Sequence, residues 1–172
     1  MTMNNKNLIA LLLLLLFVKG YTQNLKLADL TRLNNMGLVD FQEYMYKNKF
    51  LFYHADTDER TRTDTVLFIN NKNLIAGFIT SKKENTVFLD NIEEAYFSEW
   101  NDELKSHDFN LVDTKIKTKN ILEKTYINST TEFVVRVSVI SDIGQPNRIK
   151  NIYKITIFKP HKRIFKKYLS QT

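Results

Sequence analysis

The residue types that catalysis needs are scarce in this chain, and they lie far apart. Its 172 residues include no cysteine and three histidines, His54, His107 and His161. Nucleophilic catalysis needs a nucleophile, a base and an orienting group brought together. None of the histidines has the spacing of a zinc site or of a nucleophile motif. The sequence therefore predicts no catalytic residue, no metal site and no cofactor, and we expect a protein that is not an enzyme.

Carboxylates alternate in one short segment, where Asp56, Asp58 and Glu59 follow His54. Such oxygens could bind Ca²⁺, but the glycine and the distant glutamate of a helix-loop-helix calcium site are missing. We interpret this segment as a solvated acidic loop. Asn128, Ser129 and Thr130 match the acceptor pattern for Asn-linked glycosylation.

An export signal precedes the fold. Lys6 is followed by an apolar run at 8–18, which is typical of the central region of a secretory signal peptide. As a helix this run would span only about 16 Å at ~1.5 Å per residue, against ~30 Å of hydrocarbon. Gly20 and Thr22 are the small residues that a signal peptidase prefers. We predict a signal peptide over 1–23; the alternative is a buried N-terminal helix.

This signal indicates a secreted or periplasmic protein with no membrane span after cleavage. A bacterial lipoprotein needs a cysteine at its cleavage site, and this chain has none. Without disulfides, residues 24–172 must be stabilised by core packing, which a domain of this length can provide because it buries roughly 70% of its unfolded surface.

Positive charge is concentrated near the C-terminus. The formal net charge is +6, yet without the signal peptide and the tail the chain is almost neutral. In the basic tail, over 160–172, we expect partner-binding residues that could meet an anionic surface by charge neutralisation and stacking: Lys162, Arg163, Phe165, Lys166 and Lys167. The alternatives are a free solvated terminus and a short helix that docks on the sheet through its apolar residues.

Hydrophobic periodicity predicts an α+β fold with helices packed on an antiparallel sheet. A helix from Leu27 closed by Gly37, a second over 38–47 and a third over 92–106 show the 3.6-residue period. Period-2 alternation predicts eight strands, over 50–55, 64–70, 73–80, 86–89, 109–117, 121–128, 131–141 and 150–159. No linker divides residues 24–172, so we expect one domain with Phe41, Met45, Trp100 and Leu104 in its core.

Two segments of the chain repeat one pattern at an offset of 59 residues. The offset pairs apolar residues across a helix and the following strand: Leu38 with Phe97, Phe41 with Trp100, Met45 with Leu104, Phe50 with Phe109, and Phe52 with Leu111. Two α-β4 pseudo-repeats, 27–90 and 91–159, would explain this pattern. Chance alignment of two amphipathic helices, each followed by strands, would also explain it.

This element order, behind a signal peptide, resembles the β-lactamase inhibitor protein and PepSY-like periplasmic domains. The resemblance implies a sheet surface that binds proteins or peptides and no catalysis. It rests on element order alone, and the disulfides of those inhibitors have no counterpart in this cysteine-free chain.

The sequence thus favours a non-enzymatic secreted or periplasmic binding protein, whose sheet surface recognises an unknown protein or peptide in the cell envelope. Two alternatives are open. One is a periplasmic immunity or inhibitor protein with one dedicated target, and the other is a small envelope enzyme that carries no recognisable motif.

Overall fold

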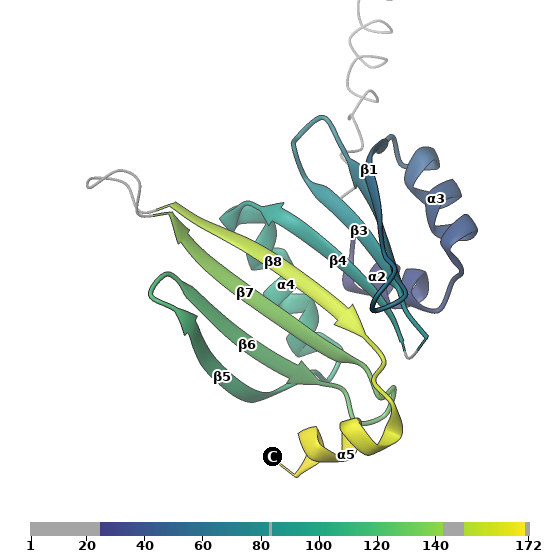
Figure 1. Ribbon diagram of the computed structural model, residues 1–172. Coiled ribbons are helices and arrows are strands. Elements are labelled where there is room, and N and C mark those ends of the chain that lie inside the picture. Colours follow the sequence, from purple (N-terminus) through teal and green to yellow (C-terminus); the bar gives the residue numbers. More distant parts are fainter. Residues whose placement is uncertain (1–24, 83, 143–149, 171–172) are drawn as a thin grey trace, which may run out of the picture.

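The computed structural model describes residues 25–82, 84–142 and 150–170. It confirms the α+β fold: four helices pack on an eight-stranded antiparallel open sheet (Figure 1). The elements follow one another in the order α2 (Leu27–Asn34), α3 (Leu38–Lys47), β1 (Leu51–Asp58), β2 (Thr63–Ile69), β3 (Ile75–Thr80), β4 (Asn85–Ile92), α4 (Glu94–Ser106), β5 (Asn110–Thr118), β6 (Ile121–Ile127), β7 (Val134–Asp142), β8 (Lys150–Phe158) and α5 (Lys162–Leu169). The predicted signal peptide lies outside the described residues.

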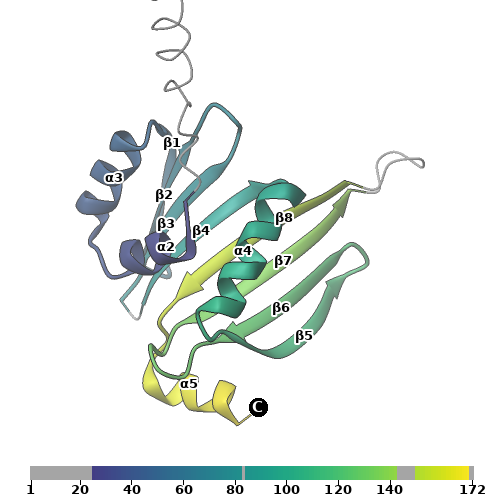
Figure 2. The ribbon, with the colours of Figure 1, turned by 180° about the vertical axis from the view of Figure 1, so that it is seen from behind.

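Each half of the chain forms a four-stranded meander, and the two meanders join in the middle of the sheet. The strand order is β1-β2-β3-β4-β8-β7-β6-β5, so β4 pairs with β8 while β1 and β5 form the two edges. Figures 1 and 2 show α2, α3 and α4 on one face of this sheet. We call the opposite face the free face. No helix within the described residues is both long and apolar enough to cross a bilayer.

The main core lies between the three helices and the sheet. Phe41, Met45, Trp100 and Leu104 are each at most 1% exposed, which confirms their predicted burial. These side chains meet alternate residues of the central strands, because successive strand residues point to opposite faces. The helices are therefore held by one apolar stripe each, as their 3.6-residue period predicts.

Gly37 does not close the first helix, so that prediction was wrong. Helix α2 ends at Asn34, and its last turn closes when the Asn35 and Met36 amides donate to the Arg32 and Leu33 carbonyls. This ending needs no left-handed residue. Gly37 instead has extended backbone, with φ of −79°, and is the N-cap of α3.

The two halves share backbone details at the offset of 59 residues. Lys49 and Asp108, which lie between a helix and an edge strand, both have a left-handed φ, 61° and 57°. Asn73 and Glu132, between later strands, are also separated by 59 residues and have φ of 61° each. Few non-glycine residues adopt this conformation, so chance would seldom place them in register.

Hydrogen bonds and a bulge follow the same offset. The Phe50 amide donates to the Met45 carbonyl and the Phe109 amide to the Leu104 carbonyl, each at 3.0 Å. Strand β1 is bulged between Phe52 and His54, and β5 is bulged between Leu111 and Asp113. A duplicated α-β4 unit would retain such features, and the duplication itself stays a prediction.

Gly77 makes room for an aromatic ring on the free face. It is paired in register with Phe88 on the neighbouring strand. A Cβ added at Gly77 would lie 2.1 Å from Phe88 Cζ, far inside van der Waals contact. The Lys154 ammonium lies over the same ring, 4.3 Å from its centroid. Glycine is therefore needed here for space, because its backbone has no left-handed φ.

Gly77→Ala should lower the free energy of unfolding by about 1–3 kcal/mol, the usual cost of overpacking. Chemical denaturation would measure this. In the double variant G77A/F88L the smaller side chain should recover part of the loss, and F88L alone is the control. Equal stability of G77A and the parent protein would contradict the packing of the ring over Gly77.

Candidate functional site

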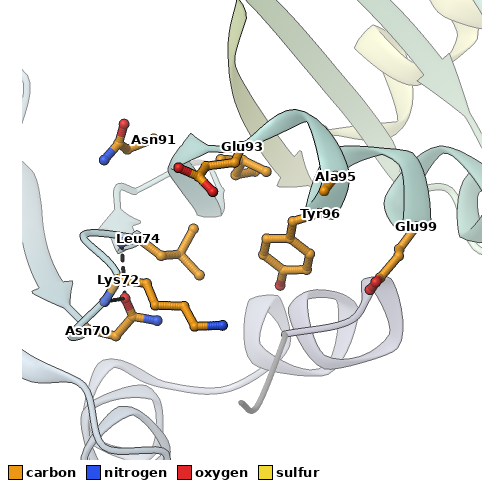
Figure 3. A pocket seen from close by; sticks show the side chains of 9 residues that line it. Asn70, Lys72, Leu74, Asn91, Glu93, Ala95, Tyr96 and Glu99 are labelled. Carbon is orange, nitrogen blue, oxygen red and sulfur yellow. Dashed lines mark hydrogen bonds between the residues drawn. The ribbon is translucent and has the colours of Figure 1, made fainter.

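A pocket of about 230 Å³ lies where α4 begins, beside the turn between β2 and β3 (Figure 3). The Lys72 side chain enters from the turn, and Tyr96 and Glu99 enter from α4. The Tyr96 hydroxyl donates to the Leu25 carbonyl at 2.6 Å. Burial raises the pKa of Tyr96 far above its ordinary value, so this phenol stays protonated.

The residues that line this pocket include no serine, threonine, cysteine or histidine. The nine lining residues are Asn70, Lys72, Leu74, Asn91, Ile92, Glu93, Ala95, Tyr96 and Glu99. The Tyr96 hydroxyl donates its hydrogen bond to a backbone carbonyl. The pocket therefore offers charge and hydrogen bonds to a small polar molecule, but its lining has no Ser, Thr or Cys nucleophile of the kind used in acyl transfer.

The glycosylation pattern at Asn128 does not lie on an accessible surface. Asn128 is only 7% exposed. Its Nδ2 donates to the His107 carbonyl at 2.7 Å, and its Oδ1 accepts from the Thr130 and Thr131 amides. Both ends of the amide are thus used to hold the turn between β6 and β7 against the end of α4. A glycan on this nitrogen would disrupt its contact with the end of α4.

The acidic segment after His54 was predicted to be a loop, but Asp56 and Asp58 belong to the edge strand β1. Asp56 and Asp58 are exposed on β1, and the Arg60 and Thr61 amides donate to one oxygen of Asp58. Hydrogen bonds from Thr61 lower the pKa of this carboxyl. Among the residues described, no group of three or more His, Asp or Glu side chains could hold a metal ion.

The free face carries an apolar surface over the first meander. Val66 and Phe68 on β2 point into the core, so Leu67 and Ile69 point to the free face. On β3, Ile75 pairs with Ile69, and Ile79 pairs with Thr65, two residues from Leu67 on the same face; Leu51 on β1 also pairs with Ile69 and is 69% exposed. We call these five residues the aliphatic patch. The other four are partly exposed.

The basic tail folds into a helix that docks on the free face at its other end. Phe165 is 4% exposed and packs with Ile127, Val134 and Phe158, apart from the main core. Arg136 Nη2 donates to the Tyr168 hydroxyl at 2.6 Å. Of the alternatives for the tail, the structure shows the docked helix. Phe165 therefore cannot be a stacking contact for a partner, contrary to our prediction.

The four predicted basic contact residues share the outer side of this helix. Lys162, Arg163, Lys166 and Lys167 are all exposed, and none has an ion-pair partner within the described part of the chain. Lys159, just before the helix, does pair with Glu132 at 3.8 Å. In a helix, the 3.6-residue period places these cations on the side away from the docked Phe165 ring. The sequence alone could not assign Phe165 to the exposed or the buried side, because it did not establish that the tail forms a helix.

Comparison with models of protein families, with curated protein sequences and with solved structures gave no match. The resemblance to β-lactamase inhibitor proteins and PepSY-like domains therefore stays a prediction.

Phe165→Ala should lower the free energy of unfolding by about 3–5 kcal/mol, as expected when a buried ring is truncated. Thermal or chemical denaturation would measure it. Ile164→Ala is the matched control, because Ile164 is 46% exposed on the same helix and should cost about 0.5 kcal/mol or less. Equal effects of the two substitutions would contradict the docking of α5 through Phe165.

Proposed function

We propose that this chain is a secreted or periplasmic binding protein without enzymatic activity, which recognises a protein or peptide partner through the free face of its sheet. The observation that carries the proposal is the aliphatic patch. Helices α2, α3 and α4 all pack on the other face, so these helices leave Leu51, Leu67, Ile69, Ile75 and Ile79 uncovered, and all five side chains are at least partly exposed. Contiguous apolar surface of this kind marks interaction sites.

Polar groups beside the patch supply the directional contacts that such an interface also needs. Lys154 Nζ lies 3.0 Å from Asp90 Oδ2 and over the Phe88 ring. Both side chains of this ion pair are about one-third exposed, so a partner could reach them. An apolar centre with a polar rim is the usual arrangement of a protein interface.

The alternative of an immunity or inhibitor protein differs only in the number of targets. It uses the same free face but predicts one dedicated partner, whereas an accessory binding protein would take several. An enzyme of unfamiliar type has less support, because the residues that line the pocket beside α4 include no serine, threonine, cysteine or histidine.

Leu67→Lys and Ile79→Lys should each abolish capture of the partner from envelope extracts, since each places a charge in the aliphatic patch. The parent chain and Val39→Lys should retain the partner, because Val39 is 76% exposed on α3 and outside the patch. Pull-down with mass spectrometry identifies the captured proteins, and thermal melting checks that each bait is folded.

Recovery of the same proteins by all four baits would contradict recognition through the free face. One captured protein would favour the inhibitor alternative over an accessory protein. N-terminal sequencing of the exported bait tests secretion: we expect it to begin between Gly20 and Leu25, and a start at Met1 would contradict export.

We also propose that the outer side of α5 attaches the protein to anionic lipid headgroups. Its four cations are exposed and without ion-pair partners in the described structure. Each basic residue near an anionic bilayer contributes about 1 kcal/mol.

The variant K162Q/R163Q/K166Q/K167Q should bind vesicles of phosphatidylglycerol and phosphatidylcholine far less than the parent chain in a sedimentation assay. Neutralising four exposed lysines elsewhere, in K47Q/K49Q/K72Q/K82Q, is the matched control and should leave most binding intact. Parent binding should fall steeply above ~0.15 M salt, where the Debye length is about 8 Å. Equal binding of both variants, or no binding of the parent, would contradict attachment through α5.

A further inference from the structure

The sheet ends in two open edges, β1 and β5, and each pairs with a neighbour on one side only. All eight residues of β1 are exposed. The outer backbone groups of an edge strand are a ready template for another strand. The question is which strand these edges accept.

Side chains of opposite charge occupy equivalent positions on the two edges. At the offset of 59 residues, Asp56 on β1 corresponds to Lys115 on β5, and Asp58 corresponds to Lys117. Both strands begin after a left-handed residue and carry the same early bulge, and β5 has a second bulge, between Ile116 and Thr118, that β1 lacks. The edges therefore share the backbone of their first halves and differ in the sign of their charge.

These four charged side chains lie on one face of the sheet. Asp56 pairs with Thr65, the neighbour of buried Val66, so it points to the free face. Lys115 pairs in register with Glu123, and Lys117 Nζ lies 3.2 Å from Glu123 Oε1. Glu123 in turn pairs with Ser138, which points away from the buried Val137. All of these groups are therefore on the free face.

Strand direction makes the two edges compatible. The sheet contains eight strands, each antiparallel to its neighbours, so β5 runs opposite to β1. A second copy placed beside the first in the same orientation would set its β5 antiparallel to β1. With Thr57 opposite Ile116, Asp58 faces Lys115 across the new ladder, and Lys117, at the second bulge of β5, lies beside Asp56. Opposite charges in cross-strand pairs are stabilising.

The same geometry disfavours pairing between like edges. Two β1 strands in the equivalent antiparallel register would place Asp56 of each opposite Asp58 of the other. Two β5 strands would do the same with Lys115 and Lys117. Like charges directly opposite are destabilising, so the charge pattern selects unlike edges and rejects like ones.

Ionisation of Asp58 and Lys115 at neutral pH supports the pattern. Hydrogen bonds from Thr61 hold the pKa of Asp58 below its ordinary value, and the contact with Asp113 raises the pKa of Lys115. Lys115 and Lys117 already pair with Asp113 and Glu123 within the same chain. The carboxylates of a second copy would therefore share these two cations with Asp113 and Glu123. The contact should therefore be weak and sensitive to salt.

We propose that the β1 edge of one copy binds the β5 edge of a second copy, so that the sheet continues from molecule to molecule. The interface is heterologous, because each copy uses a different edge, and it leaves a free β1 and a free β5 at the ends of the assembly. This goes beyond the proposed function and does not depend on it, because it uses the edges rather than the aliphatic patch.

Sedimentation velocity over a series of protein concentrations tests the proposal with the chain from residue 24 onward. The parent chain should associate at about 0.01 M salt, where the Debye length is about 30 Å, and dissociate near 1 M, where it is about 3 Å. D56K/D58K and K115D/K117D should each weaken association by about tenfold, because each turns attractive cross-strand pairs into repulsive ones. Circular dichroism and melting check folding, which these exposed substitutions should preserve.

Sedimentation of a mixture of the two variants is the decisive measurement. D56K/D58K has two basic edges and K115D/K117D has two acidic edges, so an equimolar mixture should associate although each alone does not. E43K/D102K and K47E/K105E make the same changes in net charge on α3 and α4, and they should associate like the parent. A monomeric parent at low salt, reversal variants that associate like the parent, or a mixture that stays monomeric would each overturn the proposal.

Discussion

The pairing of β4 with β8 is the constraint on which the rest of the structure depends. It is the one ladder between the two meanders within the described residues, and it sets Val87 opposite Ile157 and Leu89 opposite Ile155. Helix α2 lies over this junction, where Asn34 Nδ2 donates to the Asn85 carbonyl at 2.7 Å and the Ile157 carbonyl at 3.2 Å. A helix from the first half thus holds strands of both halves, and the core is continuous across them.

The pairing of β4 with β8 also determines which strands form the two edges of the sheet. Because β4 and β8 meet in the middle, β1 and β5 become the edges. They share an early bulge at equivalent positions, while Asp56 and Lys115 give them opposite charge. Backbone features maintain the fold in both halves, and the side chains on that backbone can diverge in function.

Helices α2, α3 and α4 cover only one face of the sheet, so apolar groups on the free face are shielded from water by other side chains. Phe88 fills the space above Gly77, and the Lys154 ammonium lies over its ring. Helix α5 covers the far end through Phe165. The aliphatic patch around Gly77 stays partly exposed, and this is why we propose recognition there.

Local sequence patterns were sufficient for the elements and for much of the core. Alternation predicted each strand, and helical spacing predicted the burial of Phe41 and Trp100, because the period of apolar residues reflects the face that an element buries. The offset of 59 residues was also visible in the sequence. Tertiary structure alone decided that β4 lies beside β8, since pairing between strands distant in the chain leaves no mark on local periodicity. It likewise decided that Gly37 begins a helix and that Phe165 is buried. The sequence could propose a docked tail, but only the partners on β6, β7 and β8 determine which side of that helix is covered, because burial is a property of two surfaces in contact.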